Sequence, residues 1–214
     1  MLDFIAAKFN EGGPFMWVIL IVLAAACAII LERIIFYFII CRTNGIELVA
    51  NVAQALNNDK VDDAKKMVYR KKNPLNVLFQ TAVERYSAGM NIDDIQEGVD
   101  ETAIKEIPKM SQRLNYLSLF ANIATLLGLL GTIAGLQVSF SSLAAVEAAK
   151  KATMLAKGIS QAMNTTAFGL IVAVPCMVLY TILSNKQKAL TKELDESVIR
   201  LLNYMKKKCL QKSN

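Results

Sequence analysis

Histidine is absent from the 214-residue chain, and its four cysteines, Cys27, Cys41, Cys176 and Cys209, form no C-x-x-C pair. Without histidine there is no Ser-His-Asp triad and no H-E-x-x-H zinc site, and the G-x-S-x-G motif of a serine hydrolase is also missing. Unpaired cysteines indicate neither a metal centre nor disulfides. We therefore predict that the chain is not an enzyme and holds no cofactor or metal.

Long apolar runs are what the sequence has instead. Hydrophobic residues make up 54% of the chain, above the roughly 45–50% that is usual for soluble domains. The mean hydropathy is +0.37. A hydrocarbon core about 30 Å thick needs roughly 20 residues of helix, and residues 16–40, 114–140 and 159–183 satisfy this. We predict an all-α integral membrane protein with three transmembrane helices.

The basic residues are distributed unevenly around these stretches. The segment before the first stretch has Lys8 alone, whereas residues 41–113 hold eleven Lys and Arg and the tail after Leu183 holds eight. Short basic segments tend to stay in the cytoplasm, which predicts an N-terminus outside the cytoplasm and a cytoplasmic C-terminus. The basic tail is typical of contact with anionic lipids. Aromatic and basic residues do not interleave, so we expect no nucleic-acid partner.

The remaining segments have recognisable patterns. Apolar residues at helical spacing predict an amphipathic outer-surface segment over 1–15, and a cytoplasmic helical domain over 41–113. Within that domain we expect helices near 46–56, 61–70, 75–87 and 92–107, with Pro108 bending or ending the last. A short periplasmic connection over 141–158 and a basic cytoplasmic helical tail over 184–214 complete the chain.

Small side chains recur at steps of three and four in the second and third apolar stretches. That spacing puts each set on one stripe of a helix. The first stripe comprises Ser118, Ala121, Thr125, Gly128, Thr132, Gly135 and Ser139, and the second comprises Ala162, Thr166, Gly169, Ala173 and Cys176. Gln161, Asn164 and Thr165 project from a neighbouring face, toward another helix, lipid headgroups or water.

Two interpretations of the stripes are open. Small residues allow close helix packing, where interhelical hydroxyl bonds contribute only about 0.6 kcal/mol each. Alternatively, the stripes line an ion pathway or a socket for another helix, with hydroxyls offered to an ion or to a partner carboxylate. In the second interpretation Thr132 and Thr166 are supporting ion ligands.

Asp, Glu, Lys and Arg are missing from 114–140 and 159–183. Because proton relays in membranes normally use ionisable groups, a carboxylate for ion transfer would have to come from another polypeptide. The first stretch has Glu32 and Arg33 near its inner end. We interpret them as an interfacial charge pair, with a functional ion site as the alternative.

Two motifs, GLLGTIAG at 128–135 and LAKGISQAMNTTAFGLIVAVP at 155–175, carry a resemblance. Through them the chain resembles the MotA/TolQ/ExbB proton channel family, particularly its TolQ/ExbB branch. The LER sequence at 31–33 and the order of spans and loops support this resemblance over nearly the whole chain.

The resemblance implies a motor subunit of the bacterial inner membrane. Five copies would surround a central pore that holds two helices of an ExbD/TolR-like, single-span partner, which supplies an intramembrane Asp. The two pore-lining threonines of the family fall on Thr132 and Thr166. Two residues depart from the branch, since Gln161 stands where Glu is frequent and Thr125 where Pro usually precedes the glycine motif. The transported ion, H⁺ or Na⁺, stays open.

Other functions are compatible with the residues alone. The stripes could only pack helices in a passive membrane scaffold or in a transport complex without ion conduction. Residues 43–109 could instead bind a soluble partner in a regulatory component. The sequence also leaves open whether the energised process is nutrient uptake, envelope maintenance or motility.

Overall fold

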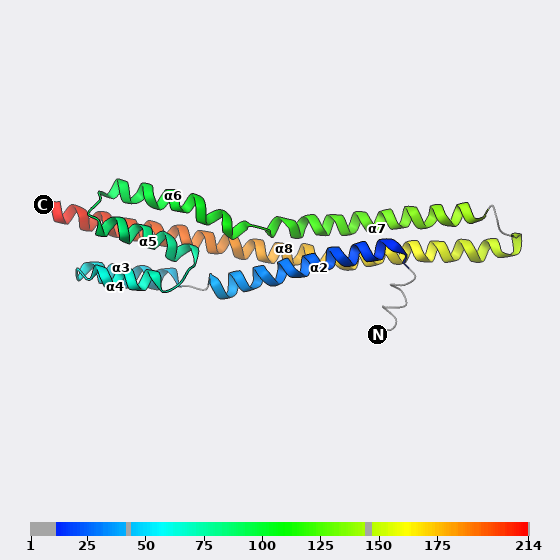
Figure 1. The fold of residues 1–214 in the computed structure, drawn as a ribbon, viewed down its shortest axis with the longest axis horizontal. Helices are drawn as coiled ribbons and strands as arrows, with labels where there is room; N and C mark the ends of the chain where they lie inside the picture. The colour runs from blue at the N-terminus through cyan, green and yellow to red at the C-terminus, as the bar shows by residue number, and fades with distance from the viewer. Residues whose placement is uncertain (1–11, 42–43, 144–146, 214) are drawn as a thin grey trace. The chain divides into compact units, whose positions relative to one another are not determined.

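The computed structural model describes residues 12–41, 44–143 and 147–213 (Figure 1). The regular elements of these residues are all helical. They are α2 Pro14–Ile35, the π-helix η1 Phe36–Ile40, α3 Gly45–Asn57, α4 Val61–Tyr69, α5 Pro74–Ser87, α6 Ile92–Ser111, α7 Leu114–Ser142 and α8 Ala148–Ser213. The predicted amphipathic segment falls largely on residues 1–11, outside the described residues.

Three helical stretches among the described residues are long and apolar enough to cross a membrane. They lie within Pro14–Asn57, Ile92–Ser142 and Ala149–Gln211, and each contains one of the three predicted spans. The all-helical fold with three apolar helices agrees with the predicted class of membrane protein.

The chain divides into two compact units. The apolar unit is Met1–Glu32 with Arg113–Ile182, and the small-helix unit is Arg33–Gln112 with Leu183–Asn214. Helix α8 contributes residues to both. Figure 1 shows α7 running alongside the first half of α8 within the apolar unit, and side-chain contacts between the two helices, given below, place them side by side.

Asparagine side chains begin three helices of the small-helix unit. The Oδ1 atoms of Asn44, Asn73 and Asn91 accept the backbone N–H three residues later, at 3.4, 2.8 and 2.8 Å. These bonds satisfy N–H groups that have no partner inside the helix. Pro74 occupies the first turn of α5, where its missing N–H costs nothing.

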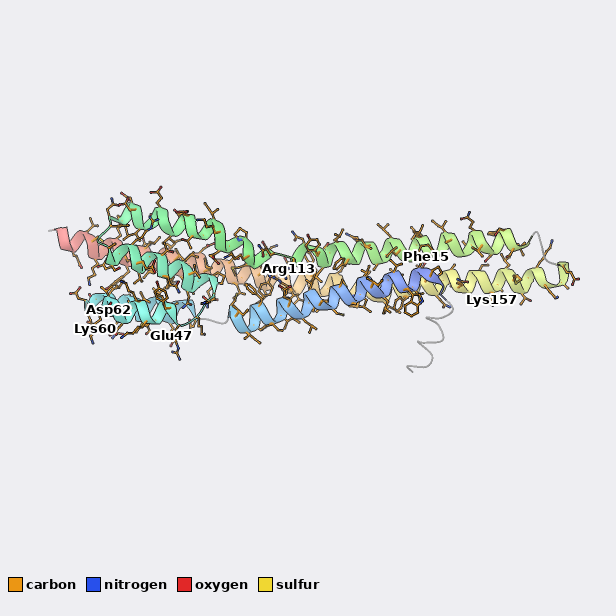
Figure 2. All side chains as sticks on the ribbon, viewed as in Figure 1. Phe15, Glu47, Lys60, Asp62, Arg113 and Lys157 are labelled. Atoms are coloured by element: carbon orange, nitrogen blue, oxygen red, sulfur yellow. The ribbon has the colours of Figure 1, made fainter. Side chains whose placement is uncertain are left out.

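The small-helix unit has a hydrophobic core of its own. Large side chains from α3, α5 and α6 meet residues from the last part of α8. The largest are Leu56, Leu78, Phe79, Ile95, Leu201 and Met205, each at most 1% exposed. Charged residues such as Glu47, Lys60 and Asp62 lie on the outside of this core (Figure 2). The helical pattern predicted over 41–113 therefore corresponds to four packed helices.

Two contacts with α2 and η1 close the C-terminus of α6. Pro108 lies inside α6, which continues to Ser111, three residues beyond the proline that was expected to bend or end it. Arg33 donates to the carbonyl of Lys109 at 3.3 Å, and Tyr37 donates to the carbonyl of Met110 at 2.7 Å. These donors satisfy carbonyls that the end of a helix leaves without an intrahelical partner.

Helix α8 is longer than the predicted third span. It begins at Ala148, inside the segment expected as a loop, and runs without interruption through the predicted tail to Ser213. Pro175 lies within it. Proline is tolerated in membrane helices because neighbouring groups can satisfy the carbonyl whose partner is lost.

Candidate functional site

The backbones of α7 and α8 approach each other closely at glycines. A Cβ atom added to Gly128 would lie 3.2 Å from the Cα of Thr166, and one added to Gly169 would lie 2.6 Å from the carbonyl oxygen of Ala124. Gly135 has the side chain of Ala162 at 3.1 Å. We call this contact the glycine seam. At Gly169 even one methyl group would have to displace backbone.

Two threonine hydroxyls meet at this seam. The hydroxyls of Thr132 on α7 and Thr166 on α8 are hydrogen-bonded to each other. Both also reach the carbonyl oxygen of Gly128, at 3.1 Å from Thr132 and 2.9 Å from Thr166. The structure thus brings together the two residues that the sequence analysis selected, and adds a backbone carbonyl to them. We call these three oxygens the threonine cluster.

The hydrogens in the threonine cluster are fewer than its contacts. Each hydroxyl has one hydrogen and two acceptor lone pairs, whereas the carbonyl only accepts. Two hydrogens therefore serve three oxygen–oxygen contacts, and lone pairs on the hydroxyls remain for another donor or a cation. Neutral protein oxygens, carbonyls above all, can replace the hydration shell of an alkali metal ion. Both threonines are half-buried, so the cluster lies at the edge of the seam.

The other small residues are divided between the seam and the exposed surface. Ala121, Gly128, Ala162, Gly169 and Ala173 are buried. Gly135 is half-buried, and Thr125 is exposed with its hydroxyl bonded to the carbonyl of Ala121 at 3.0 Å. Most of the predicted stripe therefore serves helix packing within one chain, and the threonines lie on its flank.

Thr165 faces the beginning of α2. Its side chain is 1% exposed, and its hydroxyl donates to the carbonyl of Gly12 at 2.7 Å. The Nε2 atom of Gln161 lies 2.5 Å from the place a Cβ would take at Gly13, where φ is +78°. The structure thus places Thr165 and Gln161 against the two glycines that precede α2. Asn164 is half-buried.

Two seam residues of α7 were not in the predicted stripe. Ala124 and Gly131 are both buried, and a Cβ at Gly131 would lie 2.3 Å from the Cγ2 of Thr165. They continue the spacing of three and four through Ala121 and Gly128. That spacing was visible in the sequence, but nothing there favoured it over the neighbouring stripe through Thr125 and Thr132.

Glu32 and Arg33, the predicted charge pair, each contact a residue outside the pair. Glu32 accepts a hydrogen bond from Arg113 at 2.8 Å within the apolar unit. Arg33 is buried, donates to Lys109, and lies over the ring of Phe36 with its guanidinium carbon 5.0 Å from the centroid. Within the described ranges, no group of three or more His, Cys, Asp or Glu is placed to hold a metal.

Residues 70–196 match the MotA/TolQ/ExbB proton channel family, a range that includes both threonines and the whole of α7. This match covers more than half of the chain. The chain belongs to the MotA/TolQ/ExbB proton channel family. The resemblance drawn from the two motifs is thereby confirmed, and membership of a channel family agrees with the prediction that the chain is not an enzyme.

Individual relatives carry the names ExbB and TolQ. The chain is 30% identical over 151 residues to the Tol-Pal system protein TolQ of Pseudomonas aeruginosa, covering 69% of this chain and 63% of that protein. It is 25% identical over 178 residues to a biopolymer transport protein ExbB homolog of Methanothermobacter thermautotrophicus, covering 83% and 62%. ExbB of Pseudomonas putida is 25% identical over 139 residues, covering 61% and 42%. The chain thus spans less than two thirds of the length of these family members.

Proposed function

We propose that this chain is a motor subunit, or stator, of the ExbB/TolQ type, driven by an ion-motive force. It forms an ion-conducting complex with an ExbD/TolR-like single-span partner and energises work in the periplasm, at the outer membrane or in motility. The complex contains five copies of the chain in the bacterial inner membrane, with the N-terminus in the periplasm and the C-terminus in the cytoplasm.

The threonine cluster is the observation that supports this proposal most directly. Three oxygens converge in a pair of apolar helices whose spans, 114–140 and 159–183, contain no Asp, Glu, Lys or Arg. Thr132 and Thr166 can stabilise an ion or a protonated partner carboxyl by hydrogen bonding, but they cannot carry a proton charge themselves. A partner Asp supplies the titrating group in this proposal.

The available energy is sufficient for a mechanical step. Moving one charge across the membrane yields about 2.3 kcal/mol per 100 mV. Hydrogen bonds between membrane helices contribute about 0.6 kcal/mol each on average. One ion therefore provides several times the energy needed to break and remake a bond at the threonine cluster.

The test is ion flux through the chain reconstituted with its partner in proteoliposomes. Replacing Thr132 or Thr166 with Val removes one hydroxyl and leaves the β-branched shape. We expect flux under an imposed membrane potential to fall at least tenfold while the complex still assembles. Thr181→Val is the matched control, because the Thr181 hydroxyl is exposed on α8 and donates to the carbonyl of Met177 within its own helix.

Measuring H⁺ and Na⁺ flux separately identifies the coupling ion. Full flux of both ions in the Thr132 and Thr166 variants would remove the threonine cluster from the mechanism.

The burial of Ala121, Ala162 and Gly169 in the seam favours the second candidate, a passive scaffold. A scaffold would show no flux in any variant, and uncouplers would not change its activity.

A further inference from the structure

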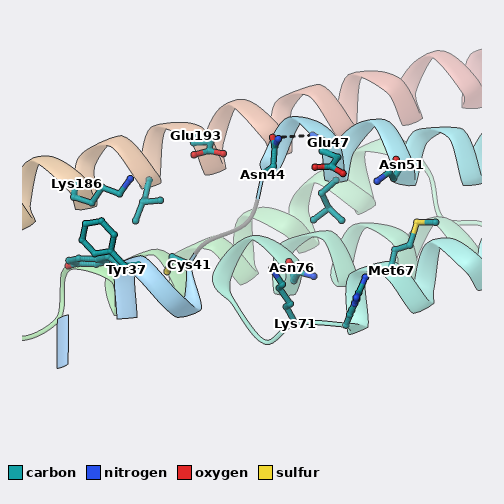
Figure 3. Close-up of a pocket in the computed structure, with 14 residues that line it drawn as sticks. Tyr37, Cys41, Asn44, Glu47, Asn51, Met67, Lys71, Asn76, Lys186 and Glu193 are labelled. Atoms are coloured by element: carbon teal, nitrogen blue, oxygen red, sulfur yellow. Dashed lines mark hydrogen bonds between the residues drawn. The ribbon is translucent and has the colours of Figure 1, made fainter. Parts of the chain in front are cut away.

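The small-helix unit contains a cavity of about 840 Å³, within the usual size of a ligand site, roughly 300–1,000 Å³. Figure 3 shows its walls, which come from η1, α3, α8 and the segment between α4 and α5. We propose that this cavity binds the headgroup of a membrane phospholipid, with the lipid phosphate on its basic side chains. The proposal requires a membrane protein but is independent of ion conduction.

The level of the cavity relative to the membrane follows from the residues that line it. Tyr37 and Phe38 come from the last turn of the first apolar stretch, and Lys186 follows the last residue of the third stretch by three positions. Both walls therefore lie where a membrane-spanning helix leaves the hydrocarbon core. Lipid headgroups occupy that level, and aromatic and basic side chains are enriched there.

The charges in the cavity fit a phosphate. Arg70, Lys71 and Lys186 contribute three cations to its lining. The Lys186 ammonium lies 5.7 Å from the centroid of the Phe38 ring, which holds it at the wall. In other membrane proteins, basic pockets between helices on the cytoplasmic side bind anionic phospholipid headgroups.

The acidic residues fit the rest of a headgroup. Glu193 accepts the backbone N–H of Gly45 at 3.2 Å, which engages its carboxylate at the start of α3. Glu47 lies on the exposed first turn of the same helix and lines the cavity. A carboxylate there can accept a hydrogen bond from a hydroxyl or ammonium group of the headgroup. Leu48, Met67 and Leu190 supply apolar lining for the glycerol end.

The experiment measures lipid binding to the delipidated full-length protein in detergent by native mass spectrometry, with dioctanoyl phosphatidylglycerol as the probe. We expect one saturable lipid per chain. Replacing the three cavity cations, as Arg70→Gln/Lys71→Gln/Lys186→Gln, should weaken binding at least tenfold. The matched control, Lys72→Gln/Lys188→Gln/Lys206→Gln, removes the same charge from exposed positions outside the lining and should stay within twofold of the unmodified protein.

Two further comparisons distinguish a lipid from a soluble phosphate as the ligand, and a specific site from a general effect of charge. Inorganic phosphate and glycerol phosphate are added at millimolar concentration as competitors, and we expect neither to displace the lipid. Displacement would assign the cavity to a soluble phosphate and overturn the lipid source. Equal loss of binding in both triple variants would show a general effect of charge, and unchanged binding in the cavity variant would place the lipid elsewhere. Either result overturns the proposal.

Discussion

The helices of the small-helix unit meet through Leu78, Phe79 and other large apolar side chains, whereas α7 and α8 meet through glycine, alanine and threonine. In water, burial of large apolar surface drives association, because each such side chain removed from water contributes about 1.5–3 kcal/mol. In lipid that driving force between helices is lost, since the acyl chains are as apolar as leucine. Small residues then hold helices together by close approach.

Polar residues differ between the two units in the same way. In the small-helix unit, asparagines cap helix termini and ion pairs such as Lys105 with Glu101 lie on the surface. In the apolar unit, Thr132, Thr165 and Thr166 bond to backbone carbonyls inside helices or between them. A threonine hydroxyl within the membrane can donate its hydrogen to a nearby backbone carbonyl. Its oxygen lone pairs then stay available to accept another hydrogen bond or to bind an ion. This makes threonine suitable for an ion pathway that contains no charge of its own.

Removing a large side chain should damage the small-helix unit most. Phe79 is fully buried in its core, and Phe79→Ala should lower its free energy of unfolding by about 3–5 kcal/mol through lost burial and a residual cavity. Denaturant unfolding in detergent, followed by hydrogen exchange of residues 44–112, measures the loss. Ile104→Ala is the control, because Ile104 is 75% exposed and should change stability by less than about 0.5 kcal/mol. Equal effects of the two substitutions would contradict the assigned core.

Adding a small group should damage the glycine seam. In Gly169→Ala the new methyl would lie 2.6 Å from the carbonyl of Ala124, so α7 and α8 must separate. We expect a loss of about 1–3 kcal/mol, the usual cost of overpacking, measured by thermal unfolding in detergent. Ala167→Val enlarges an exposed position two residues away on the same helix and should have little effect. If Gly169→Ala leaves the thermal stability unchanged, α7 and α8 can move apart without loss and close contact at Gly169 is not required for stability.

The apolar stretches, the small stripes and the threonine pair could be predicted from the sequence because each depends on local spacing. Local spacing does not determine which of two overlapping stripes of small residues on α7 packs in the seam. The stripe through Thr125 and Thr132 shares Ala121 and Gly128 with the stripe through Ala124 and Gly131. The contact of Thr165 with Gly12, just before α2, lies on the face that is buried.

Two further features were beyond local reasoning. Pro108 was expected to bend or end its helix, and α6 continues three residues past it to Ser111. The cavity of the small-helix unit is lined by residues from Tyr37 to Glu193, so no single stretch of sequence contains it. Pairwise contacts over such separations are set by packing, which periodicity does not describe.

The smallest expected effect concerns the caps that distinguish the small-helix unit from the apolar one. Asn91→Ala removes the side-chain oxygen that accepts the Asp94 N–H at 2.8 Å, and should cost about 1 kcal/mol of stability. Asn91→Ser keeps an acceptor at the N-cap and should restore most of the loss, as measured by the same denaturant unfolding. Because these helices depend on water-exposed termini, the loss should also appear as faster hydrogen exchange in the first turn of α6. Unchanged exchange there would show that core packing alone stabilises the start of α6. Helix capping would then not be a difference between the small-helix unit and the apolar unit.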